Sequence, residues 1–191
     1  MKNKLLNFEE YFEELEKACD VSNENERNIQ LALLRNIQDA VLEWETHMQE
    51  YDYKQFCKEL VERGIRFTPV NDRTTKAKWT KLFASYIPKE KRKEVYFEQY
   101  KWHLFSFELL KALSDDAARA AFDAEPKDSL YLFWQHTDQA YLVENAHLFK
   151  AEDFDHTFIP FSDFYLFSPE GKWTYIHTHE SMCSPYFYKL P

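Results

Sequence analysis

Glycine is nearly missing from this chain of 191 residues, which contains only Gly64 and Gly171. Phosphate-binding loops of the G-x-x-x-x-G-K and G-x-G-x-x-G types need closely spaced glycines, because the backbone must come close to the phosphate. The sequence therefore excludes P-loop nucleotide triphosphatases and Rossmann-type dehydrogenases. It also contains no G-x-S-x-G nucleophile elbow and no H-E-x-x-H zinc pair.

Cysteines and long apolar runs are scarce as well. The cysteines Cys19, Cys57 and Cys183 form no C-x-x-C pair, and their odd number argues against a disulfide framework. No apolar run approaches the ~20 residues that span a bilayer. The N-terminal stretch MKNKLLNFEEYFEELEKACD turns acidic before an apolar core of signal-peptide length can form. We therefore expect a cytoplasmic protein with reduced thiols and no membrane segment.

What the chain does contain is typical of a globular protein. Hydrophobic residues make up 45% and charged residues 30%, which argues against disorder. Aromatic residues reach 18%, with 17 Phe and 12 Tyr. Side chains of this kind fill protein cores and are also common on protein-binding surfaces. The length is sufficient to bury a core without disulfides or metal.

The net charge of −9 is spread unevenly along the chain. Residues 1–64 carry −7, residues 65–101 carry +6 and residues 102–191 carry −8. An acidic chain repels phosphate backbones at long range, which argues against nucleic acid as the partner. The basic segment 65–101 nevertheless interleaves Lys and Arg with aromatic residues, as single-strand-binding grooves do. An amphipathic helix gives the same pattern, so both interpretations stay open.

The first third of the sequence predicts helices. Residues 8–19 place apolar side chains on one helical face. After the polar run VSNENE, apolar residues alternate spacings of three and four, as in a helical hairpin or short coiled coil: Leu34, Ile37, Val41, Trp44, Met48 and Tyr51. This seam over residues 34–51 can pack within the chain or join two chains as a homodimer. Gly64 is expected to cap the helix. We thus expect a helical module over residues 1–62 and a second domain over residues 63–191.

The second domain is predicted to be α+β. Two hairpins are expected over residues 129–146 and 163–178, with turns HTDQ and PEGK. The other expected elements are strands at 64–70 and 102–110 and helices at 75–87, 89–100 and 114–125. Because strands and helices do not alternate regularly, we expect an antiparallel or mixed sheet with helices packed on one face.

The stretch WTYIHTHE, residues 173–180, holds most of the chemically capable side chains. Residues two apart on a strand point the same way, so His177 and His179 would share a face. A metal site would need a third ligand, for which His103 and Cys183 are available. Glu180 with a histidine could act in acid–base chemistry, and Cys183 with His179 could form a nucleophilic pair.

A structural role is the alternative for the same residues, because buried histidines commonly donate hydrogen bonds within the fold. We predict no metal centre and no cofactor. The candidate binding residues are Trp102, His103, His177, His179 and Glu180.

Several motifs resemble a bacterial family catalogued only as a domain of unknown function. They are KWHLFSFE at 101–108, LYLFWQ at 130–135 and WTYIHTHESMCSPYFY at 173–188. The resemblance spans about residues 63–190 and implies no activity. Residues 1–62 lie outside it and look like an added helical module.

These observations favour a non-catalytic intracellular protein-binding module, such as an immunity or antitoxin-like inhibitor. Acidic inhibitors of basic toxins gain association rate from charge complementarity. A small hydrolase or metal-dependent enzyme built on His177, His179 and Glu180 is the first alternative. A nucleic-acid binder that uses residues 65–101 is the second.

Overall fold

The computed structural model describes residues 8–19, 23–154, 163–183 and 185–190, and the chain divides into two compact units. Unit 1 comprises residues 1–54 and unit 2 comprises residues 55–191. The division falls inside helix α2 (Glu24–Glu62), before the position expected from the sequence. Its last turns belong with unit 2 because Phe56 and Leu60 pack into the core of that unit.

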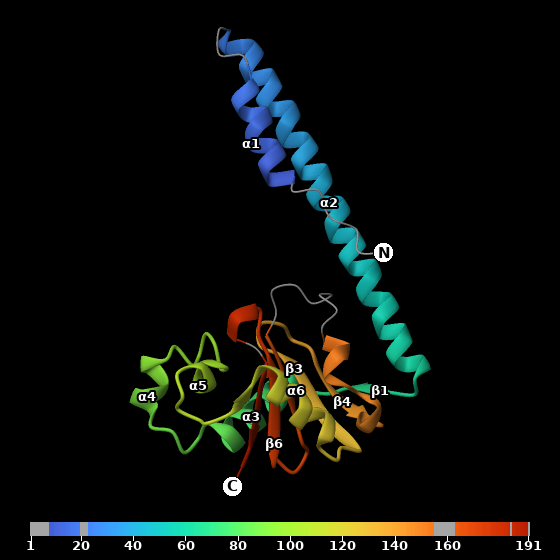
Figure 1. Ribbon diagram of the computed structural model, residues 1–191, viewed down its shortest axis with the longest axis vertical. Helices are drawn as coiled ribbons and strands as arrows, with labels where there is room; N and C mark the ends of the chain where they lie inside the picture. The colour runs from blue at the N-terminus through green and yellow to red at the C-terminus, as the bar shows by residue number, and fades with distance from the viewer. Residues whose placement is uncertain (1–7, 20–22, 155–162, 184, 191) are drawn as a thin grey trace. The chain divides into compact units, whose positions relative to one another are not determined.

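Unit 1 is the expected N-terminal helical hairpin. Helix α1 (Phe8–Ala18) is followed by α2, which starts where the side chain of Asn23 accepts from the backbone N–H of Asn25 at 3.1 Å (Figure 1). Although α2 has 39 residues, charged side chains interrupt it throughout. Within the described ranges, no helix is both long and apolar enough to cross a bilayer.

Gly64 ends α2 as the sequence predicts. Its φ of +96° lies in the left-handed region, where glycine has no side-chain clash. The N–H of Gly64 donates to the carbonyl of Val61 at 2.9 Å, and that of Ile65 to Leu60 at 3.1 Å. These two bonds form a Schellman cap and direct the chain into the first strand.

Unit 2 is built on one seven-stranded sheet in which every neighbouring pair is antiparallel. The strand order is β1-β4-β3-β5-β6-β7-β2. The strands are β1 (Arg66–Pro69), β2 (Leu113–Ser114), β3 (Ser129–Trp134), β4 (Ala140–Glu144), β5 (Phe164–Phe167), β6 (Trp173–His177) and β7 (Tyr186–Lys189). Both predicted hairpins are present, as β3–β4 and β5–β6, and the α+β class is confirmed.

Helices pack against both faces of the sheet, whereas the sequence pattern was expected to place them on one. The α-helices of this unit are α3 (Asp72–Phe83), α4 (Lys89–Glu94), α5 (His103–Ser106) and α6 (Asp115–Ala124). Helix α6 covers one face together with the 3-10 turns Ala146–Leu148 and Ala151–Phe154. Helix α3 and the segment around α4 and α5 cover the other face (Figure 1).

The alternation of side chains along β6 shows why helices pack on both faces of the sheet. The rings of Tyr175 and Phe122 of α6 lie 4.5 Å apart on one face. On the other face, the indole of Trp79 from α3 donates to the hydroxyl of Thr174 at 2.9 Å. Four of the five residues of β6 are buried, and His177 is half-buried. The side chains on both faces of the strand therefore need apolar partners.

One predicted strand is wrong. Residues 102–110 were expected to alternate between two faces, but they contain the short helix α5 and turns. The N–H groups of Phe105 and Phe107 donate to the carbonyls of Trp102 and His103. A short run in which nearly every residue is apolar does not distinguish a strand from a buried helical turn.

Candidate functional site

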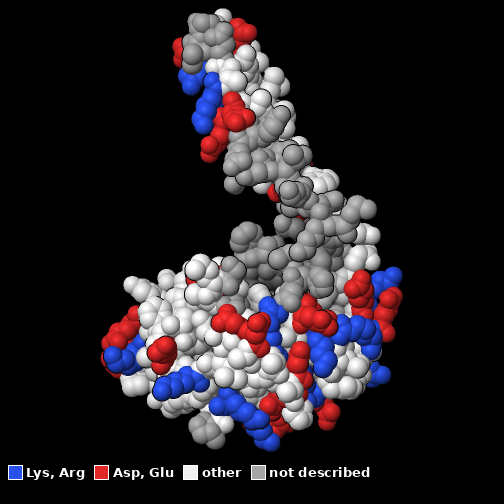
Figure 2. All heavy atoms as spheres, in the orientation of Figure 1, with Lys and Arg blue, Asp and Glu red and all other residues white. Residues whose placement is uncertain are grey.

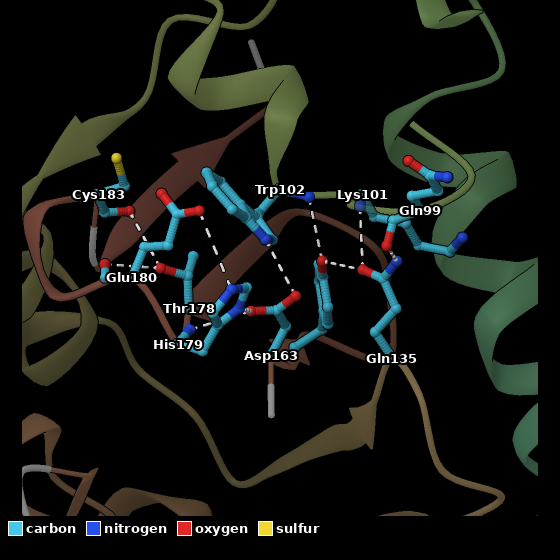
Figure 3. A network of polar contacts seen from close by, with 10 residues as sticks. Gln99, Lys101, Trp102, Gln135, Asp163, Thr178, His179, Glu180 and Cys183 are labelled. Atoms are coloured by element: carbon cyan, nitrogen blue, oxygen red, sulfur yellow. Dashed lines mark hydrogen bonds and ion pairs between the residues drawn. The ribbon is translucent and has the colours of Figure 1, made fainter. Parts of the chain in front are cut away.

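Two candidate residues, Trp102 and His179, meet at the carboxyl group of Asp163, whose side chain is fully buried. The indole Nε1–H of Trp102 donates to Oδ2 at 3.0 Å. The backbone N–H and ring Nδ1 of His179 donate to Oδ1 at 3.0 and 2.8 Å (Figure 3). Three N–H groups therefore satisfy the carboxyl, as its burial requires.

A second branch of the network passes through Tyr165. Its hydroxyl accepts from the backbone N–H of Trp102 at 3.0 Å and donates to Oε1 of Gln135 at 2.6 Å. That oxygen also accepts from the N–H of Lys101 at 2.9 Å. Burial, and then the nearby Asp163, raises the pKa of Tyr165 well above its usual value, so the phenol keeps its proton and can donate. The network fastens the loop before α5 to the sheet.

His177 and His179 lie on opposite faces, so the prediction that they share one is wrong. Strand β6 ends at His177, and the alternation stops there. The ring of His177 stacks on Phe164, its cross-strand partner, with 5.0 Å between centroids. Phe164 belongs to the core on the α6 side. His179 lies beside Tyr100 and Trp102 instead, which pack on the opposite side. The two imidazoles therefore do not point at one ion.

His103 follows Trp102 at the start of α5, not on a strand. Its Nδ1–H donates to the carbonyl of Val95 at 2.7 Å, which assigns the proton to that nitrogen because a carbonyl can only accept. Its ring lies 4.3 Å from that of Trp102 and 4.9 Å from that of Tyr100. Within the part of the chain that the structure describes, no cluster of three or more His, Cys, Asp or Glu side chains could hold a metal ion.

The pair of Asp163 and His179 resembles one part of a general-base site. A buried carboxyl orients the imidazole, and Nε2 faces Glu180 at 3.9 Å. A hydrolase also needs a nucleophile within reach and a cavity for its substrate. Two cavities of about 430 and 560 Å³ lie elsewhere, one beside Lys127 and Trp173 and the other beside Ser106 and Cys183. None of the candidate histidines lines either cavity.

Cys183 does not have the environment of a reactive thiol. Burial raises the pKa of Cys183, and the carboxylate of Glu180 raises it further. Catalytic cysteines show the opposite shift, because the thiolate is the nucleophile. This argues against the proposed pair of Cys183 with His179.

Several cations of the segment 65–101 contact groups of the protein itself. Lys76 lies 3.0 Å from the carboxylate of Asp72, and Lys78 lies 4.5 Å above the ring of Tyr131. Lys101 lies 4.9 Å from the centroid of Phe97, and burial lowers the pKa of that lysine. On the visible face of unit 2, blue and red groups are interleaved (Figure 2). These contacts fit the amphipathic interpretation of the segment.

A different kind of candidate site lies in unit 1. In the described ranges of residues 12–54, every side chain for which burial is known is exposed or half-buried. The half-buried positions of α2 in this unit fall on one side of the helix: Gln30, Leu31, Leu34, Val41 and Glu45. A neighbouring side of the same helix carries what we call the exposed stripe: Leu33, Ile37, Ala40, Trp44, His47 and Tyr51. Two of the six residues of the predicted seam, Leu34 and Val41, are thus half-buried, and the other four are exposed.

Sequence reasoning found the seam but missed Asp163. No motif marks this residue, which stands at the start of DFYLFS and looks like an ordinary strand-flanking aspartate. Its burial beneath Trp102 depends on a contact between segments 61 residues apart. One signal was available in the sequence. A carboxylate directly before a run of apolar strand residues loses contact with water, which is unfavourable unless N–H groups donate hydrogen bonds to it.

The fold and the network define an antiparallel α+β domain that follows a helical hairpin. The family described as "Domain of unknown function (DUF4275)" matches residues 54–187, and the chain belongs to that family. The match confirms the resemblance seen in the sequence, and it starts where unit 2 starts. No curated protein and no solved structure matches the chain.

Proposed function

We propose that this chain is a non-catalytic protein-binding module and that unit 1 carries its binding surface. The observation that carries the proposal is the exposed stripe. Leu33, Ile37, Trp44 and Tyr51 are 58%, 53%, 52% and 56% exposed, and they follow one side of a long helix. A continuous row of large apolar side chains left in water is typical of a surface that another protein covers.

The lack of burial in unit 1 supports the same proposal. A helix gains most of its stability in a protein from packing an apolar face rather than from intrinsic propensity. Among the residues whose burial is described, every buried hydrophobic residue lies in unit 2. The hairpin therefore needs a partner to gain the stabilisation that unit 2 gains by burying apolar side chains in its own core.

An inhibitor of the immunity or antitoxin type is a narrower form of this proposal. Its support is the net charge of −9, which would speed the approach of a basic partner. The exposed stripe itself carries no Asp or Glu, so it does not distinguish a basic partner from a neutral one. The hydrolase alternative has its own support in the orientation of His179 by Asp163.

The test compares two substitutions on opposite sides of α2. Ile37→Glu places a charge in the exposed stripe. Leu42→Glu is the matched control, because Leu42 is equally exposed at 53% and lies nine residues, or two and a half turns, from Leu33. Each variant and the wild type would be used to isolate associated protein from cells, and the complex would then be rebuilt from purified components.

We expect a defined protein, either foreign or the chain itself, to bind the wild type and Leu42→Glu but not Ile37→Glu. Identical binding by all three would contradict the proposal. His179→Ala should bind like the wild type. If it alone lost the partner, the binding surface would lie at the Asp163 network instead.

A further inference from the structure

We propose that the partner of the exposed stripe is a second copy of this chain, and that two unit 1 hairpins associate as an antiparallel four-helix bundle. This inference rests on the proposed function, since it names the occupant of the same surface. The spacing of the stripe, its charge, its area and its symmetry each support a second copy.

The spacing is that of a helix-packing seam. Leu34, Val41 and Met48 repeat every seven residues, and Ile37, Trp44 and Tyr51 repeat in the same way three residues later. A repeat of this kind fits another helix laid nearly parallel to the first. Leu34 and Val41 are half-buried, whereas Met48 and the second three residues are exposed. The open side therefore fits a further helix, as in four-helix bundles.

The charge of the stripe fits a copy of itself. Asp39 stands about 120° around α2 from the middle of the stripe, and Glu45 is among the half-buried positions. Glu43 lies at the edge of the stripe, where its carboxylate is 3.8 Å from Nε2 of His47. Two copies of a chain with net charge −9 repel each other over most of their surface. Along the middle of the stripe they meet apolar groups, and the carboxylate of Glu43 lies only at its edge, beside His47. A basic partner would find that single carboxylate next to four large apolar side chains.

The stripe supplies apolar area for a dimer interface. Leu33, Ile37, Trp44 and Tyr51 are 52–58% exposed and Met48 is 39% exposed, and a standard interface buries about 800 Å² on each side. From Leu33 to Tyr51 the stripe runs for about 27 Å at 1.5 Å per residue. A surface of this size can be covered by one helix of equal length, which a second α2 supplies.

The symmetry points to an antiparallel arrangement. Rotation by two-fold symmetry about position 42 places Leu33 opposite Tyr51 and Ala40 opposite Trp44, and each contact occurs twice. The small Ala40 then leaves room for the large Trp44 of the other copy, as close packing requires. A parallel pair in register would instead place Trp44 on Trp44 and leave a gap between two alanines.

The first measurement is the mass of the full chain by light scattering across a concentration series. We expect a dimer for the wild type and for Leu42→Glu, and a monomer for Ile37→Glu and Trp44→Glu. The helical signal of unit 1 should fall on dilution, since association and helix formation are coupled. The cooperative unfolding of unit 2 should be unchanged in the variants, which separates lost association from misfolding.

Cross-linking tests the orientation. In chains whose three native cysteines are replaced by serine, Leu33→Cys and Tyr51→Cys are made separately. The antiparallel bundle predicts a disulfide only when the two are mixed. A disulfide that forms with Leu33→Cys alone would overturn the antiparallel arrangement, because position 33 of one copy would then lie beside position 33 of the other.

The results also separate this inference from the proposed function. If the wild type stays monomeric at all concentrations, the inference that a second copy covers the stripe is wrong. If its foreign partner is nevertheless lost in Ile37→Glu, protein binding by the stripe stands. A dimer that persists in Ile37→Glu and Trp44→Glu overturns the role of the stripe in self-association.

Discussion

The two units of this chain bury their side chains very differently. Unit 2 packs aromatic residues on both faces of a seven-stranded sheet, and Trp79, Trp102 and Trp173 are all at most 2% exposed. Unit 1 leaves Trp44 52% exposed. Both units contain large apolar side chains. They differ in the number of packed layers of secondary structure, because each helix of a two-helix hairpin is covered on only one side.

This difference supports our proposal that the two units have different roles. A domain with a complete core holds its shape alone, and its polar network around Asp163 fixes a loop to the sheet. None of the hairpin's side chains whose burial is described is buried, and we propose that the hairpin depends on association. The family match covers residues 54–187, so the surface that we propose for binding lies outside the region shared with the family.

The largest expected effect compares the same substitution in both units. Trp173→Ala removes a buried side chain that packs 5.9 Å from Phe122 and should cost about 3–5 kcal/mol. Trp44→Ala should change the unfolding free energy of unit 2 by less than about 0.5 kcal/mol, because Trp44 is exposed in another unit. Chemical denaturation measures both. Equal losses would show that the two units share one core.

A smaller effect is expected for Asp163→Ala. The substitution leaves the indole N–H of Trp102 and the N–H groups of His179 without their acceptor. Buried donors without partners cost about 1–3 kcal/mol, so we expect a loss near the upper end of that range. His179→Ala keeps the contact to Trp102 and should cost about 1 kcal/mol.

Thermal unfolding of both variants, with Glu180→Gln as a partly exposed comparison, ranks the contributions. A larger loss for His179→Ala than for Asp163→Ala would show that the imidazole, rather than the carboxyl, organises the network.

The smallest effect concerns alkaline pH. Burial raises the pKa of Tyr186 to about 12, and the charges of Cys183, Asp115 and Glu180 add to the shift. Unfolding exposes the phenol, whose ordinary pKa is about 10, so the folded chain holds its proton more tightly. This contribution to stability is complete below about pH 10 and is lost as the pH rises to about 12.

The check is the denaturation midpoint at about pH 8 and about pH 11, measured for the wild type and Tyr186→Phe. The variant should show the shallower fall between the two pH values. A steeper fall would mean that other groups dominate this range.

Local rules account for much of the fold. Gly64 caps α2 because its left-handed conformation strains any other residue, and Pro169 with Gly171 turns the hairpin between β5 and β6. The apolar runs of β3 and β4 required an antiparallel pair, since the short polar turn HTDQ joins them. These features depend on neighbours in the chain and could be read from it.

Other features depend on which segments meet. Residues 102–110 satisfy the pattern of a strand, yet the loop is held as a helical turn by Asp163 and Tyr165 from distant positions. The separation of His177 from His179 likewise follows from where β6 ends. Only the three-dimensional arrangement could show that His179 turns toward Trp102.

By itself the sequence determined the class of the domain, the hairpin ahead of it and the apolar seam of α2, because periodicity and capping act within a few residues. The tertiary structure alone decided that both faces of the sheet are covered, that Asp163 is buried beneath Trp102 and that four of the six seam residues stay exposed. The physical reason is that burial is a property of the packed chain. The sequence shows the same leucine or tryptophan whether or not another part of the molecule covers its side chain.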